Sequence, residues 1–151
     1  MMTIEEFKKK YTEKSRLIGL DLGSKRIGIS ICDENMTIAT PFKTLDKANL
    51  KNFINEIVQI IHEYNIKGIV IGNPINMDGS TGPSSQSVKD FANEFLKKIN
   101  IPACFWDERL STVGAFNLSS QLDISVSKRT KNIDKNAAAF ILQGAIDYLN
   151  N

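Results

Sequence analysis

A single carboxylate inside an apolar run is the feature that most constrains this chain. The stretch LIGLDLGSKRIGIS carries Asp21 in its first apolar run and a basic pair, Lys25 and Arg26, after the glycine that precedes the second run. The pattern predicts a β-hairpin with strands at residues 17–22 and 26–33. Because apolar residues at successive strand positions require cover on both faces of a sheet, a carboxylate there is costly unless it is paired or binds a metal.

Two interpretations of Asp21 are open from this stretch alone. The side chain can cap a turn, or pair with Lys25 or Arg26, at the end of a strand. Alternatively, Asp21 is the first member of a cluster of metal-binding carboxylates. The remaining acidic residues of the chain are needed to choose between these two roles.

Length and composition limit the class of protein. With 151 residues, of which 42% are hydrophobic and 24% charged, the chain suits one soluble domain with a full core. It has no apolar run of membrane-spanning length and no apolar signal segment, so we expect a cytoplasmic protein without a membrane partner. Cys32 and Cys104 lie in apolar strand-like runs and are expected to be buried thiols. The net charge of +2 means that any phosphate-binding surface must be local.

The order of the predicted elements indicates an α/β domain. Residues 1–16 are expected to form a helix or a loose arm ahead of a single domain at 17–151. After the hairpin, the apolar patterns predict three strands, at about 37–43, 67–72 and 103–106. They also predict four helices, at about 47–64, 84–99, 112–121 and 133–149. Pro41 indicates an edge position or a bulge for the third strand. This order predicts a five-stranded mixed sheet with helices on both faces.

Two further acids occupy positions at which a sheet edge could gather them. Glu108 follows the predicted last strand beside Asp107, and Asp134 begins the predicted last helix. Asp134 is in helical phase with Ala138 and Ile141, so we expect it on the face that packs on the sheet. An acid in a first turn also complements the helix dipole, which leaves a purely structural role open. Converging Asp and Glu oxygens suit Mg²⁺ or Mn²⁺.

Candidate phosphate-binding side chains lie close to these acids in the sequence. The candidate cations are Lys25, Arg26, Lys128 and Arg129. The second pair belongs to residues 122–132, which are polar, lack helical periodicity and are expected to form a loop, so a solvated surface is an alternative. Ser84, near the start of a predicted helix, can offer a hydroxyl and a backbone N–H to a phosphate, or can simply cap the helix.

Four motifs together carry a family resemblance. They are GLDLGSKRIGI from Gly19, GNPINMDG from Gly72, DERLST from Asp107, and IDKNAA from Ile133 with the following ILQ. In this order they resemble the YqgF/RuvX family, described both as Holliday junction resolvases and as pre-16S rRNA nucleases. The similarity covers about residues 17–149. It departs from the family at Asn73, where Leu is common, at Ser111, where Thr is common, and in the arm at residues 1–16.

The resemblance implies an RNase H-like fold and metal-dependent cleavage of structured nucleic acid. Carried over by position, Asp21, Glu108 and Asp134 would form an acidic triad that binds Mg²⁺ or Mn²⁺. The residues implied to face the phosphates are Lys25, Arg26 and Arg109. The implied partner is a pre-rRNA or a branched DNA, and a homodimer is among the expected assemblies.

Three functions are therefore compared with the leading hypothesis, an endonuclease of ribosomal RNA maturation. Resolution of four-way DNA junctions uses the same chemistry, and no motif that reads a 2′-hydroxyl separates RNA from DNA here. A non-catalytic nucleic-acid-binding domain could keep the same fold. An actin-like or sugar-kinase-like ATPase could use the same glycine-containing hairpin for phosphates, but those folds need two such domains and 151 residues supply one.

Overall fold

A computed structural model of the chain describes residues 1–10, 13–73, 82–107 and 126–151. Within these ranges, only the backbone is described at residues 83–84 and 126–135. The helix predicted at 112–121 lies outside the described residues.

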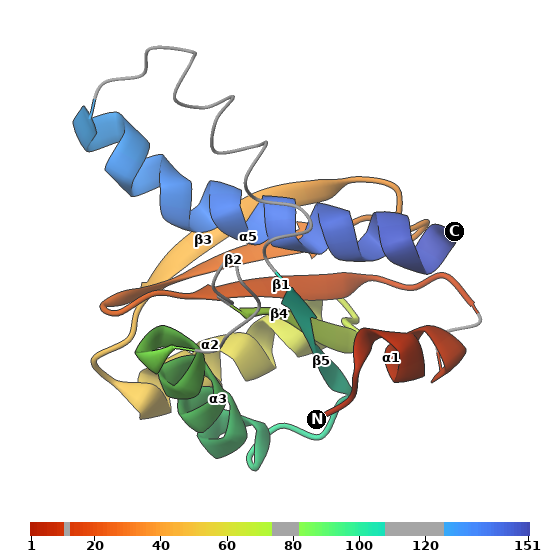
Figure 1. Cartoon of the computed structure of the whole chain (residues 1–151), viewed down its shortest axis with the longest axis horizontal. Coiled ribbons are helices and arrows are strands. Elements are labelled where there is room, and N and C mark those ends of the chain that lie inside the picture. The colour runs from red at the N-terminus through yellow and green to blue at the C-terminus, as the bar shows by residue number, and fades with distance from the viewer. Residues whose placement is uncertain (11–12, 74–81, 108–125) are drawn as a thin grey trace.

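A five-stranded sheet with the order β3-β2-β1-β4-β5 forms the centre of the molecule (Figure 1). The strands are β1 (Leu17–Leu22), β2 (Arg26–Cys32), β3 (Ala39–Asp46), β4 (Gly68–Asn73) and β5 (Ala103–Asp107). β1, β4 and β5 run parallel, while β2 pairs antiparallel with both β1 and β3. The predicted mixed sheet is thus confirmed.

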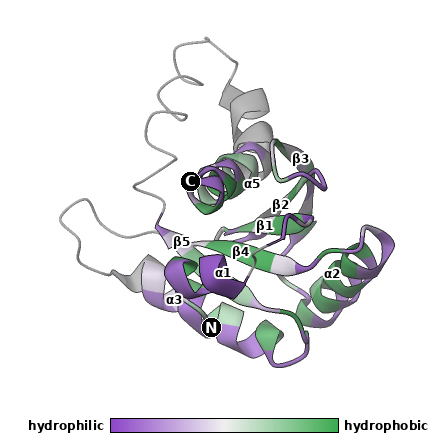
Figure 2. Ribbon diagram, turned by 90° about the vertical axis from the view of Figure 1, so that its right-hand side faces the viewer, coloured by the Kyte–Doolittle hydropathy of each residue, from purple (hydrophilic) through white to green (hydrophobic). Residues whose placement is uncertain are grey.

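Helices cover both faces of this sheet. They are α1 (Ile4–Lys10), α2 (Leu50–Glu63), α3 (Pro83–Leu96) and α5 (Val126–Asn150). Figure 2 shows α5 on one side of the sheet and α2 and α3 on the other, with hydrophobic residues between the layers. The core accordingly divides into two clusters, one under α2 and α3 and the other under α5 and α1.

Strand alternation assigns each strand residue to one of these two faces. On β1, Ile18 and Leu20 belong to the cluster under α2 and α3, whereas Leu17 belongs to the cluster under α5. On β5, Cys104 and Trp106 belong to the cluster under α5. We call these two surfaces the α2/α3 face and the α5 face.

The N-terminal segment is part of the packed structure. Phe7 of α1 is fully buried in the cluster of the α5 face. The N–H of Met2 donates a hydrogen bond of 2.9 Å to the carbonyl of Ala103, and Met2 forms an isolated parallel bridge with Cys104. The start of the chain therefore covers part of the β5 edge, which would otherwise offer unpaired backbone groups.

Helix α5 approaches the sheet very closely at Gly19. The Ser30 hydroxyl of β2 donates a hydrogen bond of 2.7 Å to the Ala138 carbonyl of α5. A Cβ atom at Gly19 would lie 2.5 Å from Ser30 Oγ, 2.7 Å from Leu142 Cβ and 3.0 Å from the Ala138 oxygen. Only glycine therefore allows α5 to sit at this depth over β1.

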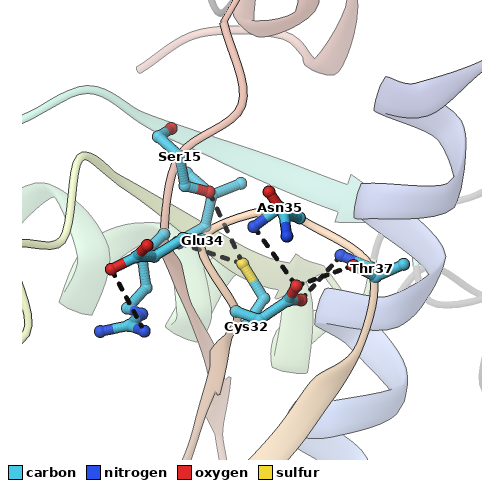
Figure 3. Close-up of polar contacts among 8 residues, drawn as sticks. Ser15, Cys32, Glu34, Asn35 and Thr37 are labelled. Atoms are coloured by element: carbon cyan, nitrogen blue, oxygen red, sulfur yellow. Dashed lines mark hydrogen bonds and ion pairs between the residues drawn. The ribbon is translucent and has the colours of Figure 1, made fainter.

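The turn between β2 and β3 is ordered by one carboxylate. Asp33 accepts hydrogen bonds from the N–H of Asn35 and from both the N–H and the hydroxyl of Thr37 (Figure 3). It also accepts from the N–H of Ile38 at 2.8 Å. These hydrogen bonds hold the pKa of Asp33 well below its usual range. The bond from the Ile38 N–H is the largest cause, and the bonds from Thr37 follow among the contacts that lower the pKa.

Two amide side chains of α5 attach the helix to the same turn. Gln143 accepts from the N–H of Ala39 at 2.8 Å and donates to the Thr37 carbonyl at 3.0 Å. Asn150 donates to the Met36 carbonyl at 2.7 Å. These contacts fix the direction of α5, whose later turns approach the β2–β3 turn.

Pro41 and the last helix test the sequence predictions in opposite ways. β3 is an edge strand with a register shift opposite Pro41, as its proline predicted. The predicted loop at 122–132 is wrong from residue 126 onward, because α5 already begins at Val126. The polar residues of this stretch show no apolar periodicity, which is the signal on which the sequence prediction of a helix depends.

No helix in the described part of the chain is both long and apolar enough to span a bilayer.

We expect Gly19→Ala to lower the free energy of unfolding by about 1–3 kcal/mol, because the added methyl group forces α5 or Ser30 to move. Urea unfolding measures this change. Val58→Ala is the control, because Val58 is 45% exposed. A free energy of unfolding of Gly19→Ala equal to or greater than that of the parent protein would contradict the close approach of α5 to Gly19.

We expect Asp33→Ala to lower the melting temperature most at neutral pH. The folded pKa of Asp33 lies below its unfolded pKa, so the ionised carboxylate stabilises the fold above about pH 4. This contribution fades as the pH falls toward the folded pKa. Thermal unfolding at pH 7, 5 and 3.5 should therefore show a difference in melting temperature between Asp33→Ala and the parent protein that becomes smaller as the pH falls. Glu34→Ala, at the exposed neighbour, should show a smaller difference throughout.

Candidate functional site

Asp21 lies at the carboxyl end of the central strand β1. It is half-buried, stands opposite Gly28 of β2, and alternation places it on the α5 face. The hairpin turn begins directly after it: the N–H of Gly23 donates to the carbonyls of Asp21 at 3.2 Å and Arg26 at 2.9 Å. A carboxylate therefore stands where a sheet strand ends and a basic turn begins.

Asn73 and Asp107 end the two neighbouring parallel strands. They are register partners on β4 and β5, and alternation places both on the α2/α3 face. Asp107, a motif residue adjacent to the predicted triad, is consequently on the opposite face from Asp21. The sequence alone could not decide this, because a shift of one residue reverses the face.

A buried polar pair ties β4 to the start of α3. The Ser85 hydroxyl donates a 2.7 Å hydrogen bond to Asn73 Oδ1, and both residues are buried. Asn73 is the position at which this chain departs from the leucine common in the resembling family. The hydrogen bond explains how a polar residue is accommodated there, because burial without a partner would be costly.

The hairpin end forms one wall of an open groove of about 840 Å³, which we call the hairpin groove. Its lining residues are Gly23, Ser24, Lys25, Arg26, Asp46, Lys47 and Ala48. Lys25 and Arg26 were predicted from the sequence and are exposed here. Lys47 was missed because it comes from the β3–α2 connection, and only strand pairing brings it to the hairpin.

The other predicted site residues are not described at the level of side chains. Glu108 and Arg109 lie outside the described residues. Asp134, Lys128 and Arg129 belong to α5, and Ser84 belongs to α3, with only their backbone described. Among the described side chains, no group of three acids, histidines or cysteines is arranged to hold a metal ion.

The two cysteines lie away from this chemistry. Both are buried free thiols, as predicted. Burial raises the pKa of Cys104 to about 12 and, as the largest cause, also raises the pKa of Cys32. Neither thiol is therefore activated as a nucleophile at neutral pH.

Comparison with known proteins places this geometry in a family. The family described as RuvX, Holliday junction resolvase, matches residues 15–148. This chain belongs to the RuvX family. The family is one of nucleases, which agrees with the predicted class of enzyme.

Two bacterial relatives of the chain carry the same description, "Putative pre-16S rRNA nuclease". The protein from Pelagibacter ubique (strain HTCC1062) is 66% identical over 151 residues, which are all of both chains. The protein from Chelativorans sp. (strain BNC1) is 42% identical over 149 residues, covering 99% of this chain and 93% of the relative.

Solved structures confirm the RNase H-like fold. T. thermophilus RuvC in complex with a Holliday junction substrate aligns with a TM-score of 0.54 at 8% identity, covering 89% of this chain and 94% of that one. The yeast mitochondrial Holliday junction resolvase Ydc2 aligns with a TM-score of 0.50 at 12% identity, covering 97% and 84%. At such identities the likeness concerns the fold alone.

We expect Ser85→Ala to lower the free energy of unfolding by about 1–3 kcal/mol, because it removes the donor that satisfies the buried Asn73 amide oxygen. The double variant Asn73→Leu/Ser85→Ala should recover most of this loss, because both polar partners are then replaced by apolar groups. Urea unfolding of the parent, Asn73→Leu, Ser85→Ala and the double variant forms a double-mutant cycle that measures the coupling. Additive losses would contradict a coupling between these two side chains.

Proposed function

We propose that this RuvX family member is a divalent-metal-dependent endonuclease that processes the 5′ end of pre-16S rRNA. The observation that carries the proposal is Asp21, a half-buried carboxylate at the carboxyl end of the central strand, two residues before a cationic groove. Relatives described as pre-16S rRNA nucleases over the full length of the chain support the choice of substrate.

The direction of α5 supports Asp134 as a partner of Asp21. Ala138 is bonded to Ser30 above Gly19, and later turns approach the β2–β3 turn, so the preceding turn extends toward the Asp21 end of β1. Asp134 lies four residues before Ala138, which is about 6 Å along the helix axis. Two residues along β1, from Gly19 to Asp21, also span about 6–7 Å. Because the two distances match and Asp21 lies on the α5 face, we propose that the backbone of Asp134 passes over Asp21.

Glu108 is the third proposed member. It directly follows Asp107 in the sequence, and it shares the odd–even parity of Cys104 and Trp106, which belong to the α5 face. Continued alternation would give residue 108 the same face as Asp21. Asp107 has the opposite parity and is therefore not proposed as a ligand.

The donor set suits a hard divalent cation, since carboxylate oxygens are the ligands that Mg²⁺ and Mn²⁺ prefer. Asp21, Glu108 and Asp134 would hold it, and the bound ion would supply Lewis-acid stabilisation and an activated water for phosphodiester hydrolysis. Lys25 and Arg26, exposed in the hairpin groove, would bind and orient the flanking phosphates. Ser84, Arg109, Lys128 and Arg129 are further proposed phosphate contacts. An rRNA substrate implies a cytoplasmic location.

Resolution of four-way DNA junctions is the second candidate function, because it is the activity that the family description names. A junction has two symmetric strands to cut, which a homodimer would match. The assay described next therefore uses both substrates, a pre-16S rRNA 5′ segment and a synthetic four-way DNA junction.

We expect Asp21→Asn to abolish cleavage in Mg²⁺ or Mn²⁺ while the thermal unfolding temperature stays close to that of the parent. Asp107→Asn is the matched control: it makes the same chemical change on the other face, and it should keep most of the activity. Gel assays with excess substrate measure both rates. Unchanged cleavage by Asp21→Asn would refute the assignment, and faster cleavage of the junction than of the RNA would favour the second function.

A further inference from the structure

The hairpin groove contains a cation that no sequence motif indicated. Lys47 follows β3, yet its backbone N–H donates to the Lys25 carbonyl at 2.9 Å, and its Nζ donates to the Gly23 carbonyl at 3.2 Å. The same Nζ lies 4.8 Å from the centroid of the Phe91 ring of α3. The ammonium group is thus held at the hairpin by a carbonyl on one side and an aromatic ring on another.

The charges of the groove favour an anion. Among the described residues, the lining holds the cations Lys25, Arg26 and Lys47 and one carboxylate, Asp46. Asp46 is partly engaged, because its Oδ1 accepts from the N–H of Ala48 at 2.9 Å. Within the described part of the chain, Lys47 has no carboxylate at ion-pair distance, whereas nearby Lys43 pairs with Glu56 at 3.0 Å.

The ammonium group of Lys47 retains donors for a ligand. A lysine carries three N–H donors, and the bond to Gly23 uses one of them. The described residues that line the groove include no aromatic side chain for a base to stack on, and the Phe91 ring beyond the lining already lies against the Lys47 ammonium. A phosphate oxygen is therefore a better match than a nucleobase, and a contact of this kind would be independent of nucleotide sequence.

We propose that Lys47 binds a backbone phosphate of the nucleic acid in the hairpin groove, as a third cation beside Lys25 and Arg26. This inference rests on the proposed function, which brings a nucleic acid past Asp21 at the start of the same turn. The lining of the groove begins at Gly23, whose N–H donates to the Asp21 carbonyl, so a strand bound in the groove would pass the end of β1 that carries Asp21. Lys47 thereby joins the substrate-binding surface from a different segment of the chain.

Binding without cleavage provides the test. The Asp21→Asn protein and its Lys47→Gln derivative are titrated in EDTA against a fluorescent single-stranded RNA from the pre-16S 5′ flank and against a four-way DNA junction. Glutamine keeps an N–H donor for the Gly23 carbonyl but removes the charge. Lys98→Gln, an exposed lysine that follows α3 far along the chain from the groove, is the matched control.

The readout is the dependence of affinity on salt. We expect Lys47→Gln to weaken binding several-fold at low salt and to make the slope of log K against log salt less steep by about 0.7 for the RNA, the value for one lost phosphate contact. Lys47→Arg should keep the parent slope, and so should Lys98→Gln. An unchanged slope in Lys47→Gln would overturn the role of Lys47 alone. Failure of the Asp21→Asn parent to bind either nucleic acid would overturn the proposed function as well.

Discussion

The depth at which α5 rests on the sheet is the constraint on which the rest of the structure depends. Gly19 leaves no side chain between β1 and the helix, and Ser30 uses the close distance to bond the Ala138 carbonyl. Gln143 and Asn150 then hold the later turns against the β2–β3 turn. With three contacts along its length, α5 has little freedom to slide or rotate over the face that carries Asp21.

This arrangement brings segments that are far apart in the sequence to one edge of the sheet. The parallel strands β1 and β4 bring their carboxyl ends to one edge, and the hairpin turn after β1 adds a cationic wall there. A helix from the end of the chain is laid across the same strand.

The two faces of the sheet carry different polar features at this edge. On the α2/α3 face, Asn73 and Ser85 satisfy one another and join β4 to α3, which is a structural use of buried polar atoms. On the α5 face, Asp21 sits half-buried beside the turn.

The sequence by itself determined the types of the strands and helices that the structure describes and the edge position of β3, and it singled out Asp21 as a candidate, because hydrophobic periodicity, proline and an isolated carboxylate are local signals. It did not determine that α5 begins at Val126, because residues 122–132 are polar and show no helical periodicity. Only the tertiary structure decided the face of Asp107 and the presence of Lys47 at the hairpin. Both depend on pairing between segments that are distant in the sequence, and neighbouring residues alone do not specify which residues pair.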